Sequence, residues 1–342
     1  MAKARPRDAD AEGSKQLDAR WLEWLALRFL EGYSDGSILK VMVGEGIDRA
    51  EAVTRLARVK ASPFVAAGQT VAKRLGKRNA FLEIRRTLAA QDPGNLQVER
   101  RKHIEPDRFF KDYYFRNRPV ILLDMIESWP AFSRWRPEYF REHFGHVPIE
   151  VQMDREQDPE YEINSPDHKR ELGFGEFVDM VLDRGKSNDF YLVANNFFFK
   201  RPDVEPLLLE VGELPGILDP GAMKGKINLW FGPAGTVTPL HHDIMNLMVA
   251  QLFGRKRVRL FPAWDIHLLY NHIGVFSEAD PEHPDPGRFP YLDRATMFDI
   301  ELAPGELLFI PVGWWHHVRA LEISITLSFS NFTVPNEYSW EF

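Results

Sequence analysis

The chain has 342 residues, enough for one large domain and a small one, and its 44% hydrophobic and 13% aromatic content is typical of a folded globular protein. It contains no cysteine, which excludes a disulfide framework and a thiolate metal site. No apolar run reaches the roughly 18 residues of a membrane span, and the charged N-terminus lacks a signal-peptide core, so we expect a cytoplasmic protein without a membrane partner.

Charge is distributed unevenly along the chain. Residues 1–100 carry 18 basic and 13 acidic side chains, a net of +5, whereas residues 101–342 carry 25 and 37, a net of −12. Because the larger part is acidic, we predict that nucleic acid is not a partner. The basic part could contact an acidic partner, but a solvated helix face is the simpler interpretation.

The N-terminal part is predicted to be a disordered tail followed by a small helical domain. Residues 1–16 are polar, and residues 17–94 follow a helical period. Asp48 is expected to cap one helix, and Ser62-Pro63 to begin a long one. This domain shows no chemistry of its own, and roles in substrate capture and in dimerisation both remain open.

Residues 95–342 are predicted to form the catalytic domain, because short strands with proline, glycine and aromatic punctuation replace the helical period. Helices are expected over residues 106–115 and 174–182. The expected strands cover residues 119–123, 227–231, 239–243, 246–253, 255–261, 297–302, 306–311 and 323–329. Many short strands with turn signals predict a double-sheet barrel, so the fold class is mostly β with α.

His241-x-Asp243, together with His316 far downstream, carries the clearest chemistry. On an extended strand, residues two apart share a face, so His241 and Asp243 can bind one ion while His242 faces away. Two imidazoles and one carboxylate on one side of an octahedron leave three positions open, as in non-haem iron(II) oxygenases. We therefore predict that His241, Asp243 and His316 are metal ligands and catalytic residues.

The second histidine doublet requires a choice between His316 and His317. Alternation places His316 on the face of Trp314 and His317 on the face of Arg319. Because Arg319 is expected to reach solvent, His316 is the better ligand. Tryptophans beside a metal shield it from water, which favours controlled dioxygen chemistry.

Lys256 is the second informative residue. Alternation places it with the apolar Val258 and Leu260, on the face expected to line the barrel. An uncompensated charge there costs several kcal/mol unless an anion meets it. A dicarboxylate co-substrate would supply that anion. A buried acidic partner, or a side chain that reaches the barrel mouth, remains an open alternative.

Together these motifs resemble the JmjC, or cupin-8-like, family of iron(II)/2-oxoglutarate oxygenases, above all its branch that hydroxylates an asparagine of hypoxia-inducible factor. The resemblance covers roughly residues 98–332. It rests on Thr-Pro-Leu-His-x-Asp, Asn246, the Gly254-x-Lys256 strand and Pro-x-x-Trp-Trp-His-x-Val. It implies a double-stranded β-helix, a jelly roll, and it does not extend to the helical domain.

The resemblance also implies a co-substrate pocket. Lys256 and Thr238 correspond to partners of the distal carboxylate of 2-oxoglutarate, and Tyr191 completes the pocket. Asn246 matches an asparagine near the iron-bound end of the co-substrate. Ser328 departs from the pattern, because the hypoxia-factor hydroxylase has asparagine there.

The implied reaction hydroxylates a C–H bond with iron(II), 2-oxoglutarate and O2, and it releases succinate and CO2. A peptide or protein substrate is implied, with Asn195 and Asn196 as candidate partners for its backbone, although both also fit a turn. The alternatives are an N-methyl-lysine demethylase, a small-molecule hydroxylase, a cupin isomerase and a non-catalytic cupin module. A homodimer stays open. Because the sequence ends at Phe342, without the C-terminal helical pair of several relatives, a homodimer would use the N-terminal helices or a barrel face.

Overall fold

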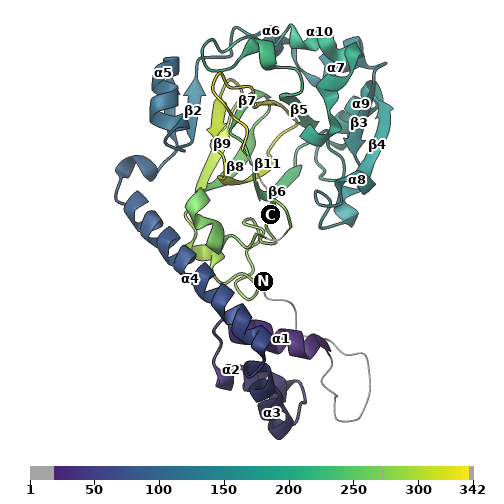
Figure 1. Ribbon diagram of the computed structural model, residues 1–342. Coiled ribbons are helices and arrows are strands. Elements are labelled where there is room, and N and C mark those ends of the chain that lie inside the picture. The colour runs from purple at the N-terminus through teal and green to yellow at the C-terminus, as the bar shows by residue number, and fades with distance from the viewer. Residues whose placement is uncertain (1–18, 272, 339–342) are drawn as a thin grey trace. The chain divides into compact units, whose positions relative to one another are not determined.

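The computed structural model describes residues 19–271 and 273–338. The chain divides into two compact units, with the boundary between Thr87 and Leu88. The predicted disordered tail, residues 1–16, lies outside the described residues. Within the described residues, no helix is both long and apolar enough to cross a membrane. Figure 1 shows the elements of both units, which are described separately below.

The first unit is a helical cluster with a small core. Its helices are α1 (Ala19–Leu30), α2 (Asp35–Gly44), α3 (Arg49–Lys60) and most of α4 (Pro63–Ala89). The Asp48 carboxylate accepts hydrogen bonds from the backbone N–H groups of Ala50 and Glu51, so the predicted cap of α3 is confirmed. Trp21 and Trp24 pack edge to face at 5.4 Å within this core.

The second unit is built on two β-sheets. One sheet has the order β1 (Glu99–Lys102), β2 (Val120–Leu123), β10 (Leu307–Ile310), β7 (Leu247–Phe253), β12 (Ser324–Phe329) and β5 (Ile227–Gly232). The other has the order β6 (Val237–His242), β11 (Trp315–Ala320), β8 (Lys256–Phe261) and β9 (Phe298–Leu302). Neighbouring strands pair antiparallel, except for the parallel pair of β1 and β2. The predicted double-sheet barrel is confirmed.

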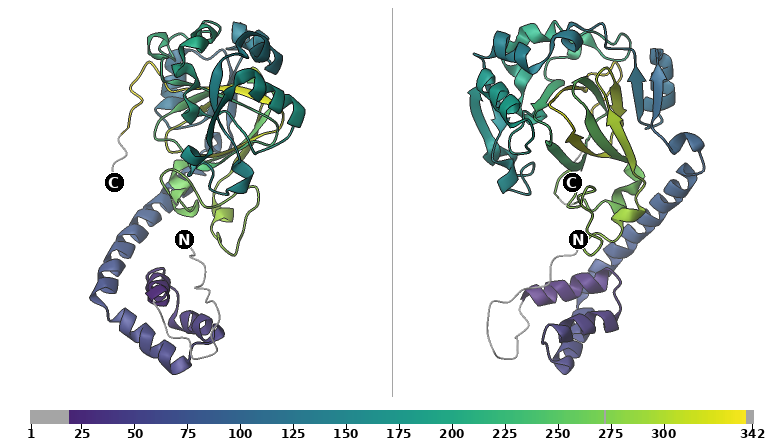
Figure 2. Two further views of the ribbon diagram at one scale, coloured as in Figure 1. Left: turned by 90° about the vertical axis from the view of Figure 1, so that its right-hand side faces the viewer. Right: turned by 180° about the vertical axis from the view of Figure 1, so that it is seen from behind.

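Helices and a two-stranded ribbon pack against the outside of this barrel. They are α5 (Pro106–Phe109), α6 (Pro130–Arg134), α7 (Pro137–Phe144), α8 (Ser165–His168), α9 (Phe174–Arg184), α10 (Glu205–Leu208), β3 (Pro148–Gln152) and β4 (Lys169–Gly173). Phe140 of α7 and Phe177 of α9 place their rings 5.7 Å and 5.4 Å from Phe231 of β5. This aromatic layer buries the outer face of the larger sheet and keeps its inner face for the barrel interior. The right-hand view of Figure 2 shows the teal helices α7 to α9 on one side of the barrel strands and α5, beside β2, on the other.

The predicted elements do not include β1, β3, β4, α6, α7, α8 and α10. There are three further differences. The predicted helix over residues 106–115 is α5 followed by a π-helical turn at Phe110–Tyr114. Strand β11, which carries His316, is missing from the predicted strands, although the alternation used to choose His316 assumes an extended chain there. Asp243 stands one residue beyond the end of β6 and not on the strand itself.

Candidate active site

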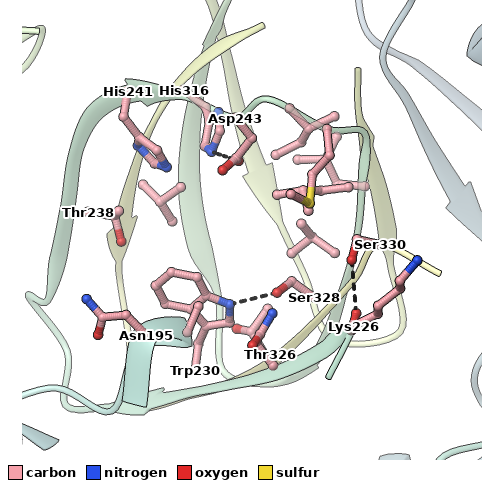
Figure 3. Close-up of a pocket in the computed structure, with 18 of the residues that line it drawn as sticks. Asn195, Lys226, Trp230, Thr238, His241, Asp243, His316, Thr326, Ser328 and Ser330 are labelled. Atoms are coloured by element: carbon pink, nitrogen blue, oxygen red, sulfur yellow. Dashed lines mark hydrogen bonds and ion pairs between the residues drawn. The ribbon is translucent and has the colours of Figure 1, made fainter. Parts of the chain in front are cut away.

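A cavity of about 540 Å³ lies in the barrel and is lined by side chains from both sheets. The smaller sheet contributes Thr238, His241, Lys256 and His316. Thr238 and His241 are three residues apart on β6, and both face the cavity because the pairing of β6 with β11 shifts register between them at a β-bulge. The larger sheet contributes mostly apolar side chains, with a polar group near Trp230. Figure 3 shows side chains that line this cavity.

His241, Asp243 and His316 converge in the cavity. Strands β6 and β11 pair so that His241 lies opposite His316, and their ring centroids are 4.1 Å apart. The Nε2 atom of His316 lies 3.4 Å from Oδ2 of Asp243. One donor atom from each of the three residues lies within 4.8 Å of the other two, and Figure 3 shows the side chains pointing toward one another. These three side chains could therefore hold one metal ion.

The second nitrogen of each imidazole is fixed by the backbone. Nδ1 of His241 lies 2.8 Å from the carbonyl oxygen of Pro239, and Nδ1 of His316 lies 3.2 Å from that of Trp314. A carbonyl only accepts, so each Nδ1 carries the proton and donates it. The Nε2 atoms are left with lone pairs for a metal, as second hydrogen bonds to ligating histidines commonly ensure.

Protonation at this end of the cavity suits a cation. Burial, together with the neighbouring His316, lowers the pKa of His241 to about 4, so its imidazole is neutral. Burial by itself would raise the pKa of Asp243, but the positive charge of the protonated form of His316, and a hydrogen bond from that form, outweigh burial and lower that pKa. Imidazole nitrogens and an ionised carboxylate are the donors that iron(II) takes in a facial triad.

The other end of the cavity holds a buried cation. Lys256 is only 4% exposed, and its Nζ donates to the hydroxyl of Tyr191 at 3.0 Å. Burial lowers the pKa of Lys256 to about 7 and raises that of Tyr191. Among the described residues, no carboxylate forms an ion pair with Lys256. These residues therefore do not supply the acidic partner that the sequence left open as an alternative. Thr238, also buried, lines the same cavity.

Asn246, like Asn196, is a predicted site residue that does not line the cavity. The strand neighbours of Asn246 show why. Leu247 and Val249 line it, so alternation turns Asn246 to the opposite face of the chain. Its Nδ2 donates to Oδ1 of Asn336 at 2.9 Å, and its Oδ1 accepts from the backbone N–H of Val312 at 2.9 Å. Asn246 therefore ties the C-terminal segment to the turn before β11, and the expected position beside a co-substrate does not agree with this geometry.

The two remaining histidines of the doublets lie elsewhere. His242 packs its ring against Trp315 at 4.7 Å. His317 faces Asp280 and Glu282 on the outer side of β11, with donor atoms again within 4.8 Å of one another. Glu282, however, already forms ion pairs with two arginines, so this second group is an ionic network and not a free set of metal donors. The geometry agrees with the choice of His316 over His317.

Asn195 and Trp230 line the cavity, whereas Asn196 does not. Asn195 lines the cavity, donates from Nδ2 to Oγ of Ser165 at 2.6 Å, and leaves its buried Oδ1 without a donor among the described residues. Asn196 instead satisfies the turn, because its Oδ1 accepts from the N–H of Val193. Trp230, which was missed, lines the cavity and donates from Nε1 to Oγ of Ser328 at 3.0 Å. Its place could have been inferred from alternation along β5.

Comparison with known proteins points in one direction. A model of the family described as "Cupin-like domain" matches residues 106–337. The chain is 32% identical over 227 residues to Lysine-specific demethylase 8 of Xenopus tropicalis, covering 64% of this chain and 49% of that protein. It is 32% identical over 248 residues to Lysine-specific demethylase JMJ30 of Arabidopsis thaliana, covering 68% and 54%.

The chain is also similar to a relative with a different name. The chain is 27% identical over 248 residues to tRNA wybutosine-synthesizing protein 5 of Gallus gallus, covering 68% of this chain and 76% of that protein. The chain thus spans about half the length of the two demethylases, and their names describe longer proteins.

Proposed function

We propose that this chain, which belongs to the cupin-like domain family, acts as an iron(II)- and 2-oxoglutarate-dependent oxygenase that hydroxylates a C–H bond. One observation carries this proposal. A single cavity holds three metal-binding donors at one end and, at the other, a buried ammonium group for which the described residues offer no acidic partner. A metal and a dicarboxylate fit these two ends.

The three converging side chains would hold the metal. His241 and His316 present Nε2 lone pairs, and Asp243 presents its ionised carboxylate. When bound, iron(II) with 2-oxoglutarate and dioxygen supplies the oxidising chemistry, in which 2-oxoglutarate becomes succinate and CO2. The side chains of this chain bind and orient, and none of them has to act as a general acid or base.

The opposite end would hold the distal carboxylate of 2-oxoglutarate. Lys256 offers a charge-assisted hydrogen bond, which is stronger than a neutral one. Tyr191 accepts from Lys256 Nζ and still has its own proton to donate to an anion, and Thr238 adds a second hydroxyl. Apolar side chains such as Leu247 and Val249 line the cavity and limit the water that competes for these bonds.

The substrate is proposed to be a side chain of a peptide or protein. Asn195 supports this, because it lines the cavity and carries a side-chain amide, a group that can hydrogen-bond an extended backbone. N-methyl-lysine demethylation is a second candidate, since several relatives are named lysine-specific demethylases. It needs the same oxidation, because hydroxylation of an N-methyl group yields an unstable product that releases formaldehyde.

Succinate release from 2-oxoglutarate tests the reaction class. We expect turnover that depends on iron(II) and is lost in Asp243→Ala. The matched control is Asp280→Ala, on the outer side of β11, which should keep turnover. Iron-independent turnover, or turnover unchanged in Asp243→Ala, would contradict the proposal. Mass spectrometry of candidate peptides then separates the substrate classes, because hydroxylation adds one oxygen atom whereas demethylation removes a methyl group as formaldehyde.

A further inference from the structure

A buried arginine lies behind the anion end of the cavity. Arg155, which begins a short 3-10 turn after β3, is fully buried. Its Nη2 donates to Oε1 of Glu162 at 3.2 Å and to the carbonyl oxygen of Val237 at 2.7 Å. Its Nε and Nη1 have no acceptor among the described residues. A buried charge with unused donors is costly for stability, so its position calls for another explanation.

The guanidinium contacts the tyrosine of the anion end. Its central carbon lies 5.2 Å from the ring centroid of Tyr191, within the range of a cation–π contact. The hydroxyl of the same ring accepts from Lys256 Nζ at 3.0 Å. A Cβ at Gly232 would lie 2.6 Å from Cδ2 of Tyr191, so the ring rests on a backbone without a side chain. Arg155 and Gly232 together fix where the Tyr191 hydroxyl points.

The same guanidinium also holds the strand that carries Thr238. The carbonyl of Val237 accepts both from Arg155 Nη2 and from the hydroxyl of Tyr161 at 3.0 Å. Val237 directly precedes Thr238 at the start of β6. One side chain outside the cavity lining therefore touches two of the three elements that form the anion end.

Charge gives Arg155 a second effect. Glu162 is nearly buried, with a side chain 9% exposed, and Arg155 is its ion-pair partner. Without Arg155, a buried carboxylate would remain uncompensated behind Tyr191. Such a charge would repel a dicarboxylate that approaches Lys256.

We propose that Arg155 is a positioning residue for the carboxylate subsite formed by Lys256, Tyr191 and Thr238. It orients the tyrosine ring, holds the start of β6 and neutralises Glu162. The inference rests on the proposed function, because it assumes that a dicarboxylate binds at this end of the cavity.

The test compares two keto acids on Mn(II)-loaded protein by calorimetry. 2-Oxoglutarate has the distal carboxylate, and 2-oxobutyrate lacks it. We expect Arg155→Met to weaken 2-oxoglutarate roughly 10- to 100-fold, the size expected for a lost charge-assisted hydrogen bond and cation–π contact. Binding of 2-oxobutyrate and of Mn(II) should change by less than about threefold, because neither uses this subsite.

The conservative variant provides the matched control. Arg155→Lys keeps a positive charge beside Glu162 but loses the planar guanidinium that contacts the Tyr191 ring, so we expect an intermediate loss for 2-oxoglutarate alone. If Arg155→Met does not fold, Arg155→Lys decides the matter by the same selectivity between the two keto acids. Equal losses for both, or no loss for either, would overturn the inference. Failure of the proposed function would show already in the unchanged protein, as no binding of 2-oxoglutarate.

Discussion

The two ends of the barrel cavity are built from opposite kinds of groups. The metal end gathers lone pairs, from two imidazoles and the carboxylate of Asp243. The anion end gathers N–H and O–H donors, from Lys256, Tyr191 and Thr238, with no acidic partner for Lys256 in the part of the chain that the structure describes. Mostly apolar walls separate them. The cavity is thus arranged for a ligand set that is positive at one end and negative at the other.

The ends also differ in how they are assembled. The metal end depends on the pairing of β6 with β11, which places His241 opposite His316. The anion end draws Lys256 from β8, Thr238 from β6 and Tyr191 from the segment that follows α9. A change at the metal end should therefore abolish metal binding, whereas changes at the anion end should each weaken the binding of 2-oxoglutarate in part.

The largest effect is expected from Asp243→Ala. It removes the only carboxylate of the three donors, so we expect metal affinity and succinate release to fall by roughly 1,000-fold or more. Metal binding is measured by calorimetry with Mn(II). His317→Gln, on the opposite face of the same strand as His316, should bind Mn(II) as the unchanged protein does. Equal losses in both variants would mean that the metal lies elsewhere.

Lys256→Met is expected to separate the two ends. Removal of the buried ammonium of Lys256 should weaken binding of 2-oxoglutarate by roughly 100-fold or more, the cost of truncating one partner of a buried charge pair. Mn(II) affinity should stay within about threefold. Arg257→Met is the matched control, because Arg257 points outward from the same strand and pairs with Asp299. Loss of Mn(II) affinity in Lys256→Met would show that the two ends are not independent.

Affinity for 2-oxoglutarate should depend on pH through Lys256. Its pKa is lowered to about 7 by burial, and the anion needs the protonated form. Affinity should hold steady just below pH 7 and fall about tenfold per pH unit above it. Calorimetry at several pH values on Mn(II)-loaded protein measures this, and Lys256→Met should abolish the slope. A slope that persists in that variant would assign the titration to another group.

The stability of the free protein should change with pH in the opposite direction. Between pH 7 and the ordinary lysine value of 10.5, the unfolded chain binds more protons at Lys256 than the folded chain does. The contribution of Lys256 to the free energy of unfolding therefore rises over that window. Denaturant unfolding of the unchanged protein and of Lys256→Met measures the difference, which should shrink as pH rises.

The smallest effect is expected from Ser328→Ala. It removes the acceptor of the Trp230 indole N–H, so we expect a loss of about 1 kcal/mol in the free energy of unfolding. Binding of 2-oxoglutarate should weaken by less than about tenfold, because Trp230 contacts the Tyr191 ring of the anion end but brings no charged group to it. Denaturant unfolding and calorimetry measure the two effects. Ser330→Ala, whose hydroxyl donates a long hydrogen bond of 3.4 Å to the carbonyl of Lys226, is the control.

Features that depend on local alternation could be predicted from the sequence. The inward direction of Lys256 and the preference for His316 over His317 follow from the two-residue period of a strand. The shared side of His241 and Asp243 was predicted in the same way, but Asp243 lies one residue beyond β6, so the turn after the strand also sets its direction. The cap at Asp48 follows from its own side chain. These features depend on only a few neighbouring residues, so they can be predicted from the sequence.

The hydrogen-bond partners of the buried polar side chains became known only from the tertiary structure. Asn246 is turned away to join Asn336, a partner 90 residues downstream. Arg155 reaches Val237 from 82 residues upstream, and no local pattern marks it. A buried polar side chain is defined by the partner that satisfies it, and that partner is fixed by packing of distant segments. For this reason the donors at each end could be named from the sequence, whereas the residues that hold them in place could not.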